Sequence, residues 1–262
     1  MFTPCTLSLT LPALHKNEEI LLGAAAPAQL ILPPDALPVS DSEMLPVGTV
    51  LTQADTLKRT DVLRIEGKCL WPAQERELYI ARVLEDCEAG DYKVETLREG
   101  YALAVITMSD KGFAGKRVDE SGPALMEMVN NTVKLCHSQR FLLPDDPARM
   151  RALVLQLNRQ GYDMIISTGG TGLSPRDLTP EALIPVLDRR VPGFEQAMMA
   201  FSLQKTPRAV LSRALTGTIG TTLIMALPGS RRAAMENLEA ILPALDHALE
   251  KLAGDTSDCG RA

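Results

Sequence analysis

The spacing of apolar positions along this chain changes near residue 101. From there on, apolar runs of strand length alternate with stretches that have helical spacing. Tyr101–Met108 is a near-continuous apolar run, which is typical of a strand buried on both faces. Further strands are predicted at residues 140–143, 164–167, 215–219 and 222–226. This order predicts an α/β domain with a mostly parallel sheet and helices on both faces.

Five helices are predicted between and after these strands. They are expected at residues 122–135, 147–160, 180–187, 192–203 and 231–252. Ser121 is suited to cap the first helix, and Pro123 lies in its first turn, where a missing amide hydrogen costs little. Gly161 stands where the second helix should stop.

The first part of the chain has a different texture. Its short apolar runs are separated by prolines and glycines, and they lie at residues 7–11, 30–32, 50–51, 62–65 and 78–83. This pattern predicts a small β-rich domain, whose role the sequence does not reveal. A length of 262 residues also favours two domains. We therefore expect a β-rich domain at 1–99, an α/β domain at 100–254 and a flexible tail at 255–262.

Composition narrows the class of protein. Apolar residues make up 45% of the chain and charged residues 23%, which is ordinary for a globular protein with a hydrophobic core. The net charge of -6 and the pI near 5.2 argue against nucleic acid as a partner, since phosphate binding needs a basic surface. A pocket with its own few charges can still hold a small anion.

Cysteine usage and hydropathy indicate a compartment. The five cysteines are scattered and form no CxxC pair, so we expect free thiols and a reducing cytoplasm. The start of the chain lacks the pattern of a secretory signal. The most apolar early stretch, residues 21–32, is too short and broken to cross a bilayer. The sequence therefore predicts a cytoplasmic protein with no membrane segment.

Polar clusters follow the predicted strands where a ligand would be expected. In open α/β sheets, ligands bind outside the carboxyl ends of the strands, near backbone amides and helix N-termini. The clusters are residues 107–110, 144–146, 168–172 with 175–177, and 228–230. Their convergence on one edge of the sheet predicts a binding site there.

Three glycines within residues 168–172 (TGGTG) indicate a loop of unusual backbone freedom. Such a loop can present its amides to a phosphate, although a plain tight turn explains the same residues equally well. The loop lacks the GxGxxG spacing of a dinucleotide-binding fold. Residues 112–117 (GFAGKR) likewise lack the spacing and the final Ser or Thr of a Walker A loop.

Two aspartates stand just past predicted strands and beside prolines. Asp145 and Asp177 could meet at the sheet edge and hold Mg²⁺, which takes one or two protein carboxylates and completes its shell with water and phosphates. Helix capping is the competing interpretation. Asp145 or Asp146 could cap the helix at Pro147, and Asp177 or Thr179 could cap the next one.

The start of the last helix offers one more anion site. Ser230 and the first amides of the helix can donate to a phosphate, while Arg231 and Arg232 supply positive charge. Simple capping by Ser230 is an equal alternative. The three histidines lie outside every cluster, so histidine acid–base chemistry is not expected.

Several of these motifs occur in an order that resembles a known family. They lie at residues 107–110, 119–123, 143–146, 167–172, 175–181, 192–194, 211–213 and 227–230. Together they resemble the molybdopterin-binding family, and specifically the molybdopterin adenylyltransferases. The resemblance covers about residues 101–252. It leaves roughly the first hundred residues, which the single-domain members lack, without a match.

The resemblance implies an activity and a set of partners. The family transfers AMP from Mg-ATP to the terminal phosphate of molybdopterin, so Mg²⁺ is implied as cofactor and ATP as co-substrate. Asp145 and Asp177 match the family's two functional aspartates and are the implied catalytic and metal-binding residues. A homotrimer and hand-off to a molybdenum insertase are also implied. Alternatives are a non-catalytic pterin carrier and an insertase-like protein that acts on adenylated molybdopterin.

Substrate binding is implied for polar and glycine residues of the same clusters. These residues are Thr107, Ser109, Asp110, Ser121, Gly169, Gly170, Thr171, Gly172, Arg176, Gly229 and Ser230. The glycines and Ser230 would cradle phosphates, and Ser109 and Asp110 would lie near the pterin or the nucleotide.

Overall fold

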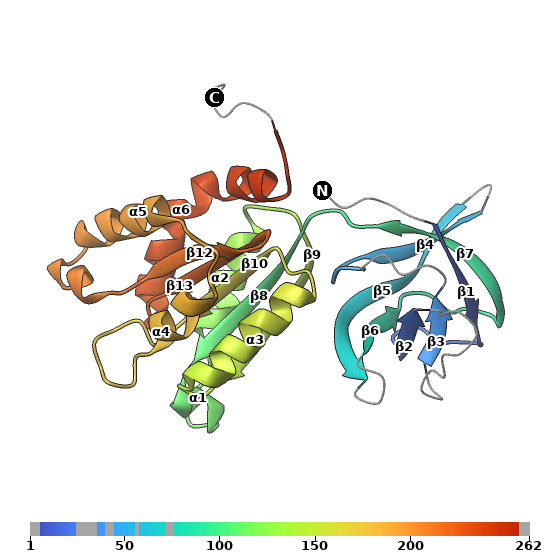
Figure 1. Ribbon diagram of the computed structural model, residues 1–262, viewed down its shortest axis with the longest axis horizontal. Coiled ribbons are helices and arrows are strands. Elements are labelled where there is room, and N and C mark those ends of the chain that lie inside the picture. The colour runs from blue at the N-terminus through green and yellow to red at the C-terminus, as the bar shows by residue number, and fades with distance from the viewer. Residues whose placement is uncertain (1–5, 25–35, 40–44, 56–57, 72–75, 257–262) are drawn as a thin grey trace. The chain divides into compact units, whose positions relative to one another are not determined.

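The computed structural model describes residues 6–24, 36–39, 45–55, 58–71 and 76–256. The chain divides into two compact units, Phe2–Gly100 and Tyr101–Ala262, each of which is described by itself. Figure 1 shows the first unit as strands and the second as a sheet with helices around it.

Seven strands of the first unit form a closed barrel in the order β1-β3-β2-β6-β5-β4-β7. Their bounds are β1 Thr6–Leu11, β2 Glu19–Ala24, β3 Ala36–Val39, β4 Val50–Asp55, β5 Lys58–Trp71, β6 Arg76–Val83 and β7 Gly90–Leu97. In β1 buried and exposed residues alternate, so Leu7, Leu9 and Leu11 point into the core while their neighbours face solvent.

Four of the apolar runs noted in the first unit coincide with strands. Residues 7–11, 50–51, 62–65 and 78–83 fall in β1, β4, β5 and β6. The run at 30–32 lies outside the described residues. The strand β7 was not predicted because its sequence, GDYKVETL, is half polar and buries fully only Val94 and Thr96.

The second unit is built on a six-stranded sheet in the order β11-β12-β13-β10-β8-β9. The strands are β8 Tyr101–Met108, β9 Leu135–Leu143, β10 Met164–Thr168, β11 Arg189–Arg190, β12 Leu215–Ile219 and β13 Thr222–Leu227. The four strands β13, β10, β8 and β9 are parallel. The sheet is nevertheless mixed, because β12 and β11 add antiparallel pairs at one edge. Only Gly220 and Thr221 separate β12 from β13, and so short a link can join only antiparallel strands.

Helices cover both faces of this sheet (Figure 1). Their bounds are α1 Asp110–Phe113, α2 Ser121–Asn130, α3 Pro147–Arg159, α4 Thr179–Leu183, α5 Pro192–Leu203 and α6 Arg231–Leu252, with 3-10 turns η2 Ile184–Val186 and η3 Pro207–Leu211. On one face, α2, α5 and α6 share a core with Leu103 and Val105 of β8. The opposite face carries α3 and α4. Within the described residues, no helix has the length and apolar character that a bilayer span requires.

Several predicted boundaries are correct and others are wrong for identifiable reasons. The last two helices span residues 192–203 and 231–252, as predicted. The strand predicted at 140–143 actually begins at Leu135, because β9 is an edge strand whose middle is exposed and polar. The predicted helix 122–135 ends at Asn130.

Two further details of the helices differ from the prediction. Ser121 is the first residue of α2 rather than its cap, and the N-cap Glu120 makes no side-chain hydrogen bond. The predicted helix 180–187 divides into α4 and η2. Pro185 lies in the first turn of η2 and lacks the amide that would continue the hydrogen-bonding pattern of α4.

The loops after β8, β10 and β13 meet at one glycine. Gly169 has φ +105°, and a methyl group at its Cα would overlap the carbonyl oxygen of Met108. The Cβ direction of Gly229 meets the Gly169 Cα at 3.1 Å. The Gly169 amide donates to the carbonyl of Leu227 at 3.2 Å. The backbone therefore packs here without room for a side chain.

We expect Gly169→Ala to lower the free energy of unfolding by more than about 2 kcal/mol, since it combines a left-handed φ with a backbone overlap. Gly115→Ala is the matched control, because Gly115 has φ +69° but open space around its Cβ direction. Urea denaturation gives the free energy of unfolding of both variants. The difference between their losses measures the cost of the steric overlap at Gly169, because both variants carry the cost of a positive φ. Equal losses in the two variants would show that the packing at Gly169 contributes nothing.

Candidate active site

Strand register places the polar clusters on one edge of the sheet. Thr107 of β8 pairs with Thr168 of β10, and Thr168 pairs with Leu227 of β13. On the other side, Met108 pairs with Leu143 of β9. All four strands are parallel, so the residues that follow them emerge at the same edge. We call this edge, made of residues 107–110, 144–146, 168–177 and 228–230, the rim.

The predicted aspartate pair is close enough to interact. Burial raises the pKa of the Asp145 carboxyl above its usual 3.8, and the negative charge of Asp177 raises this pKa further. The Asp145 side chain is 24% exposed, so water screens the repulsion only partly. The backbone amide of Asp145 donates to Asp110 Oδ1 at 2.9 Å. Three acidic residues therefore gather at the rim.

Helix capping does not account for Asp145 or Asp177. The cap of α3 is Asp146, whose carboxylate accepts hydrogen bonds from the amides of Ala148 and Arg149. The N-cap of α4 is Leu178, which makes no side-chain capping bond. Asp177 instead accepts the amide hydrogen of Ser174 at 2.9 Å within its own loop. The capping interpretation is thus correct for Asp146 and wrong for the other two aspartates.

Arg176 supplies positive charge beside the acidic residues. Its guanidinium forms an ion pair with Asp110 and lies 3.6 Å from a carboxylate oxygen of Asp145. The Arg176 side chain is 65% exposed. It is therefore turned toward protein carboxylates, and binding to a substrate phosphate would require it to exchange these partners.

The glycine loop divides into a packed part and an open part. The Cβ direction of Gly170 points at the Thr179 hydroxyl, and that of Gly172 meets Asp177 Oδ2 at 2.7 Å. The glycines therefore allow close packing against protein rather than clearing space on that side. In the described part of the chain, the amides of Gly170, Thr171 and Gly172 donate no hydrogen bond. These three amides, and not that of Gly169, are the ones available to an anion.

Thr179 fixes the shape of this loop. Its hydroxyl donates to the carbonyl of Gly169 at 2.8 Å, and its amide donates to the carbonyl of Gly170 at 3.0 Å. Thr179 is 3% exposed, so both bonds are shielded from water. The first turn of α4 thereby holds two consecutive carbonyls of the loop and leaves the following amides open.

Two of the predicted serine hydroxyls already accept local hydrogen bonds, and a third is buried. Ser109 accepts the amide hydrogen of Gly112 at 3.1 Å and caps α1. Ser230 accepts from the Ala233 amide at 3.2 Å and caps α6, as its alternative interpretation foresaw. Ser121 is buried at the start of α2. Each hydroxyl still carries a proton that can be donated to a ligand.

Sequence reasoning assigned no role to two residues that hold the rim together. Asp119 accepts from the Thr107 hydroxyl at 2.9 Å and from the Gly122 amide at 3.0 Å, which joins the end of β8 to the start of α2. Its position just before a predicted helix was a usable signal for such a contact. Arg213 binds the loop at residues 171–177 from about forty residues further along the chain. Arg213 lies in the motif at 211–213 that contributes to the family resemblance, but no local pattern shows which residues it contacts.

The rim offers the donor types that Mg²⁺ prefers. Carboxylate oxygens of Asp145 and Asp177 suit a hard cation, and a positive charge between them would relieve the repulsion that raises the Asp145 pKa. In the part of the chain that is described, no group of three or more His, Cys, Asp or Glu is arranged to hold a metal ion. A magnesium ion here would therefore complete its shell with water and, once substrate is bound, with phosphate oxygens.

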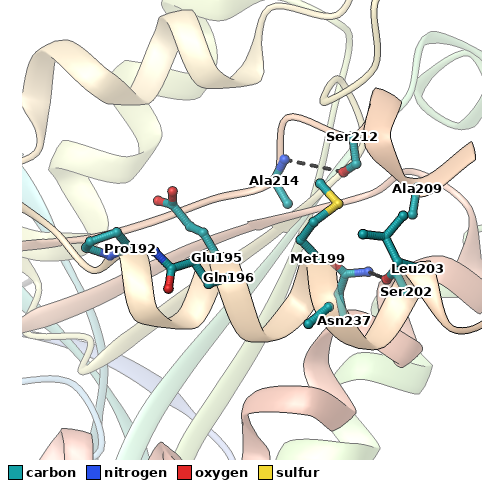
Figure 2. Close-up of a pocket in the computed structure, with 11 residues that line it drawn as sticks. Pro192, Glu195, Gln196, Met199, Ser202, Leu203, Ala209, Ser212, Ala214 and Asn237 are labelled. Carbon is teal, nitrogen blue, oxygen red and sulfur yellow. Dashed lines mark hydrogen bonds between the residues drawn. The ribbon is translucent and has the colours of Figure 1, made fainter. Parts of the chain in front are cut away.

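A hollow of about 440 Å³ lies away from the rim, beside α5, η3 and the start of α6. Figure 2 shows Met199 and Leu203 in its lining and the hydrogen bond between Asn237 and Ser202. Its lining includes no residue of the rim. Because the hollow is mostly apolar and lacks the aspartate pair and the glycine loop, the rim is the better candidate for phosphate chemistry.

Comparison with known proteins identifies the family of the second unit. Residues 104–247 match the family described as "Probable molybdopterin binding domain". The chain is 40% identical over 153 residues to a molybdenum cofactor biosynthesis bifunctional protein of Chlorobaculum tepidum, covering 58% of this chain and 48% of that one. It is 35% identical over 141 residues to the molybdopterin adenylyltransferase of Haemophilus influenzae, covering 53% and 72%.

A solved structure gives the same result. The molybdopterin biosynthesis enzyme MoaB of Thermus thermophilus superposes with a TM-score of 0.55 and 43% sequence identity, covering 59% of this chain and 98% of its own. The second unit therefore has the α/β fold of the molybdopterin-binding domains. This chain belongs to that family. It spans about half or less of the length of the first curated relatives that it matches.

We expect Asp145→Asn to raise the free energy of unfolding at pH 7. The folded state binds the Asp145 proton more tightly than the unfolded chain does, so ionisation above pH 3.8 costs stability. A neutral amide avoids this cost and should stabilise by roughly 0.5–2 kcal/mol. The gain in stability should disappear as the pH falls below 3.8, the pKa of this carboxyl in the unfolded chain, because Asp145 is then protonated in both the folded and the unfolded state.

Urea denaturation at neutral and acidic pH measures this difference. Asp146→Asn is the matched control. Asn caps a helix as well as Asp does, so this variant keeps the cap of α3 and loses only the negative charge of residue 146. A loss of stability in Asp145→Asn at pH 7 would contradict the proposed repulsion at the rim.

Proposed function

We propose that this protein transfers the adenylyl group of Mg-ATP to the terminal phosphate of molybdopterin, giving adenylated molybdopterin and pyrophosphate. The observation that carries the proposal is the meeting of the Asp145–Asp177 pair with the open amides of the glycine loop at one rim. The names of its relatives, which include molybdopterin adenylyltransferases, support the same reaction.

The chemistry needs positioning and charge neutralisation rather than a covalent intermediate. A phosphate oxygen of the pterin attacks the α-phosphorus of ATP, and the bond from that phosphorus to the bridging oxygen breaks as pyrophosphate leaves with the electron pair. A magnesium ion would neutralise negative charge on the triphosphate. Asp145 and Asp177 are the residues that would hold it.

Backbone amides supply the rest of the phosphate site in this proposal. The amides of Gly170, Thr171 and Gly172 would bind phosphate oxygens, together with the first amides of α6 behind Ser230. Arg176 would move from Asp110 to a phosphate oxygen as the substrate arrives, which its exposed position permits. Ser109 and Asp110 would then lie against the pterin or the nucleotide.

The direct test is to incubate the protein with molybdopterin, ATP and Mg²⁺ and to measure pyrophosphate and adenylated pterin. Both products must appear in equal amounts for the proposed reaction. Tight pterin binding without turnover would instead identify a carrier. Consumption of adenylated molybdopterin in the presence of molybdate would identify an insertase-like protein.

We expect Asp177→Asn to lower turnover by two orders of magnitude or more, since one of only two metal-binding carboxylates is lost. The affinity for pterin should stay within about threefold of wild type, because the loop amides remain. Steady-state kinetics and fluorescence titration with pterin measure the two quantities. The control Asp146→Asn removes a neighbouring charge whose carboxylate caps α3 and holds no metal in this proposal, so it should keep wild-type turnover. Normal turnover in Asp177→Asn would refute its assigned role.

We also propose that the second unit is the catalytic domain and assembles as a homotrimer that hands its product to a molybdenum insertase. Exposed Ile184, Val210 and Leu211 give this unit apolar surface that an assembly can cover. A fragment beginning near Arg98 is expected to keep the turnover and, by light scattering, the trimeric mass of the full chain. A monomeric or inactive but folded fragment would assign an essential role to residues 1–99.

A further inference from the structure

The guanidinium of Arg213 joins the two ends of the loop at 172–177 to helix α4. Its Nε donates to the carbonyl of Gly172 at 2.9 Å, and its Nη2 donates to the carbonyl of Asp177. Its backbone amide donates to the carbonyl of Thr171 at 2.9 Å. One residue, placed just before β12, therefore holds both ends of the loop at 172–177.

Glu181 of α4 anchors this guanidinium. Arg213 Nη1 donates to Glu181 Oε1, and this bond lowers the pKa of the Glu181 carboxyl. Three different nitrogens of Arg213 thus serve three different acceptors. A lysine ammonium at the same position could not reach all three, because it lacks the planar fork of donors.

The loop held in this way carries an aspartate of the proposed metal site and adjoins the open amides. Asp177 is at its end and accepts the amide hydrogen of Ser174, while Gly172 is at its beginning. The residues between, 173–176, are exposed, so packing does little to fix them. The loop closes on itself through two bonds between Ser174 and Asp177, and the contacts of Arg213 are the ones that tie both of its ends to Glu181 of α4 and to the chain before β12.

We propose that Arg213 is a positioning residue that fixes the Asp177 carboxylate relative to the phosphate-binding amides. This inference rests on the function proposed for the rim. Arg213 touches no substrate in this scheme, because its nitrogens are directed at loop carbonyls and at Glu181. It acts by keeping a metal ligand and an anion site in register, and an error of about 1 Å in such a register can cost about a hundredfold in rate.

The affinity for a metal ion tests the proposal, because loss of positioning and loss of positive charge should change this affinity in opposite directions. Removing a positive charge near a cation site should strengthen cation binding if charge were all that mattered. Loss of positioning should weaken it, by about tenfold or more, as for other residues that orient metal ligands. Binding of Mn²⁺ to the full-length protein, followed by electron paramagnetic resonance, distinguishes the two effects.

The expected Mn²⁺ affinity decreases from wild type to Glu181→Gln, then to Arg213→Lys and then to Arg213→Gln. Asp177→Asn should bind Mn²⁺ as weakly as Arg213→Gln or more weakly. Arg208→Gln is the matched control, since it removes an exposed arginine of the preceding turn and should bind Mn²⁺ as wild type does. Unchanged or tighter binding in Arg213→Gln overturns the proposal. Failure of the wild type to bind Mn²⁺ also overturns it.

Kinetics then separate positioning from simple loss of folding. For Arg213→Lys and Arg213→Gln we expect kcat to fall, the Mg²⁺ concentration needed for half-maximal rate to rise, and pterin affinity to stay within about threefold of wild type. A purely structural role predicts a lower melting temperature and a smaller active fraction with an unchanged Mg²⁺ requirement, and this result overturns the proposal. If the wild type binds Mn²⁺ but forms no adenylated pterin, the proposed function fails while the Mn²⁺ series still decides the role of Arg213.

Discussion

The parallel register of β9, β8, β10 and β13 is the constraint on which the site depends. Because the carboxyl ends of these strands lie level to within one residue, loops that are far apart in the chain emerge together. Residues 107–110 and 228–230 are separated by more than a hundred positions, yet both follow strands that pair with β10. A slip of one register step in any of these strands would move its loop and reverse the facing of its side chains.

Negative charge is concentrated where this register brings the loops together. Asp110, Asp145 and Asp177 are held by backbone geometry, by the ion pairs of Arg176 and by the loop bond to Ser174. The rest of the unit provides the energy that tolerates this repulsion, through a core shared by α2, α5, α6 and the sheet. Electrostatic cost in an otherwise well-packed domain is typical of a site shaped for ligand binding rather than for stability.

Much of this arrangement could be predicted from local sequence, and the exceptions have physical reasons. Apolar continuity identified the buried strands β8 and β10, and helical spacing identified α5 and α6 to the residue. The edge strand β9 was underestimated because its polar middle faces solvent. The convergence of Asp145 and Asp177 on one edge of the sheet was predicted because both residues follow strands of a parallel sheet. The hydrogen bonds from Arg213 to Asp177 and Gly172 could not be predicted, because these partners lie 36 and 41 residues away and only the folded chain brings them together.

The packing at Gly169 gives the rim two walls of different character. On one side, the backbones of three loops touch with no side chain between them, so this wall cannot yield without disturbing the sheet itself. On the other side, residues 173–176 are exposed and tied down mainly at their ends. A bound molecule therefore meets one rigid surface that fixes where its phosphate lies, and one adaptable surface that can adjust to the remainder of its shape.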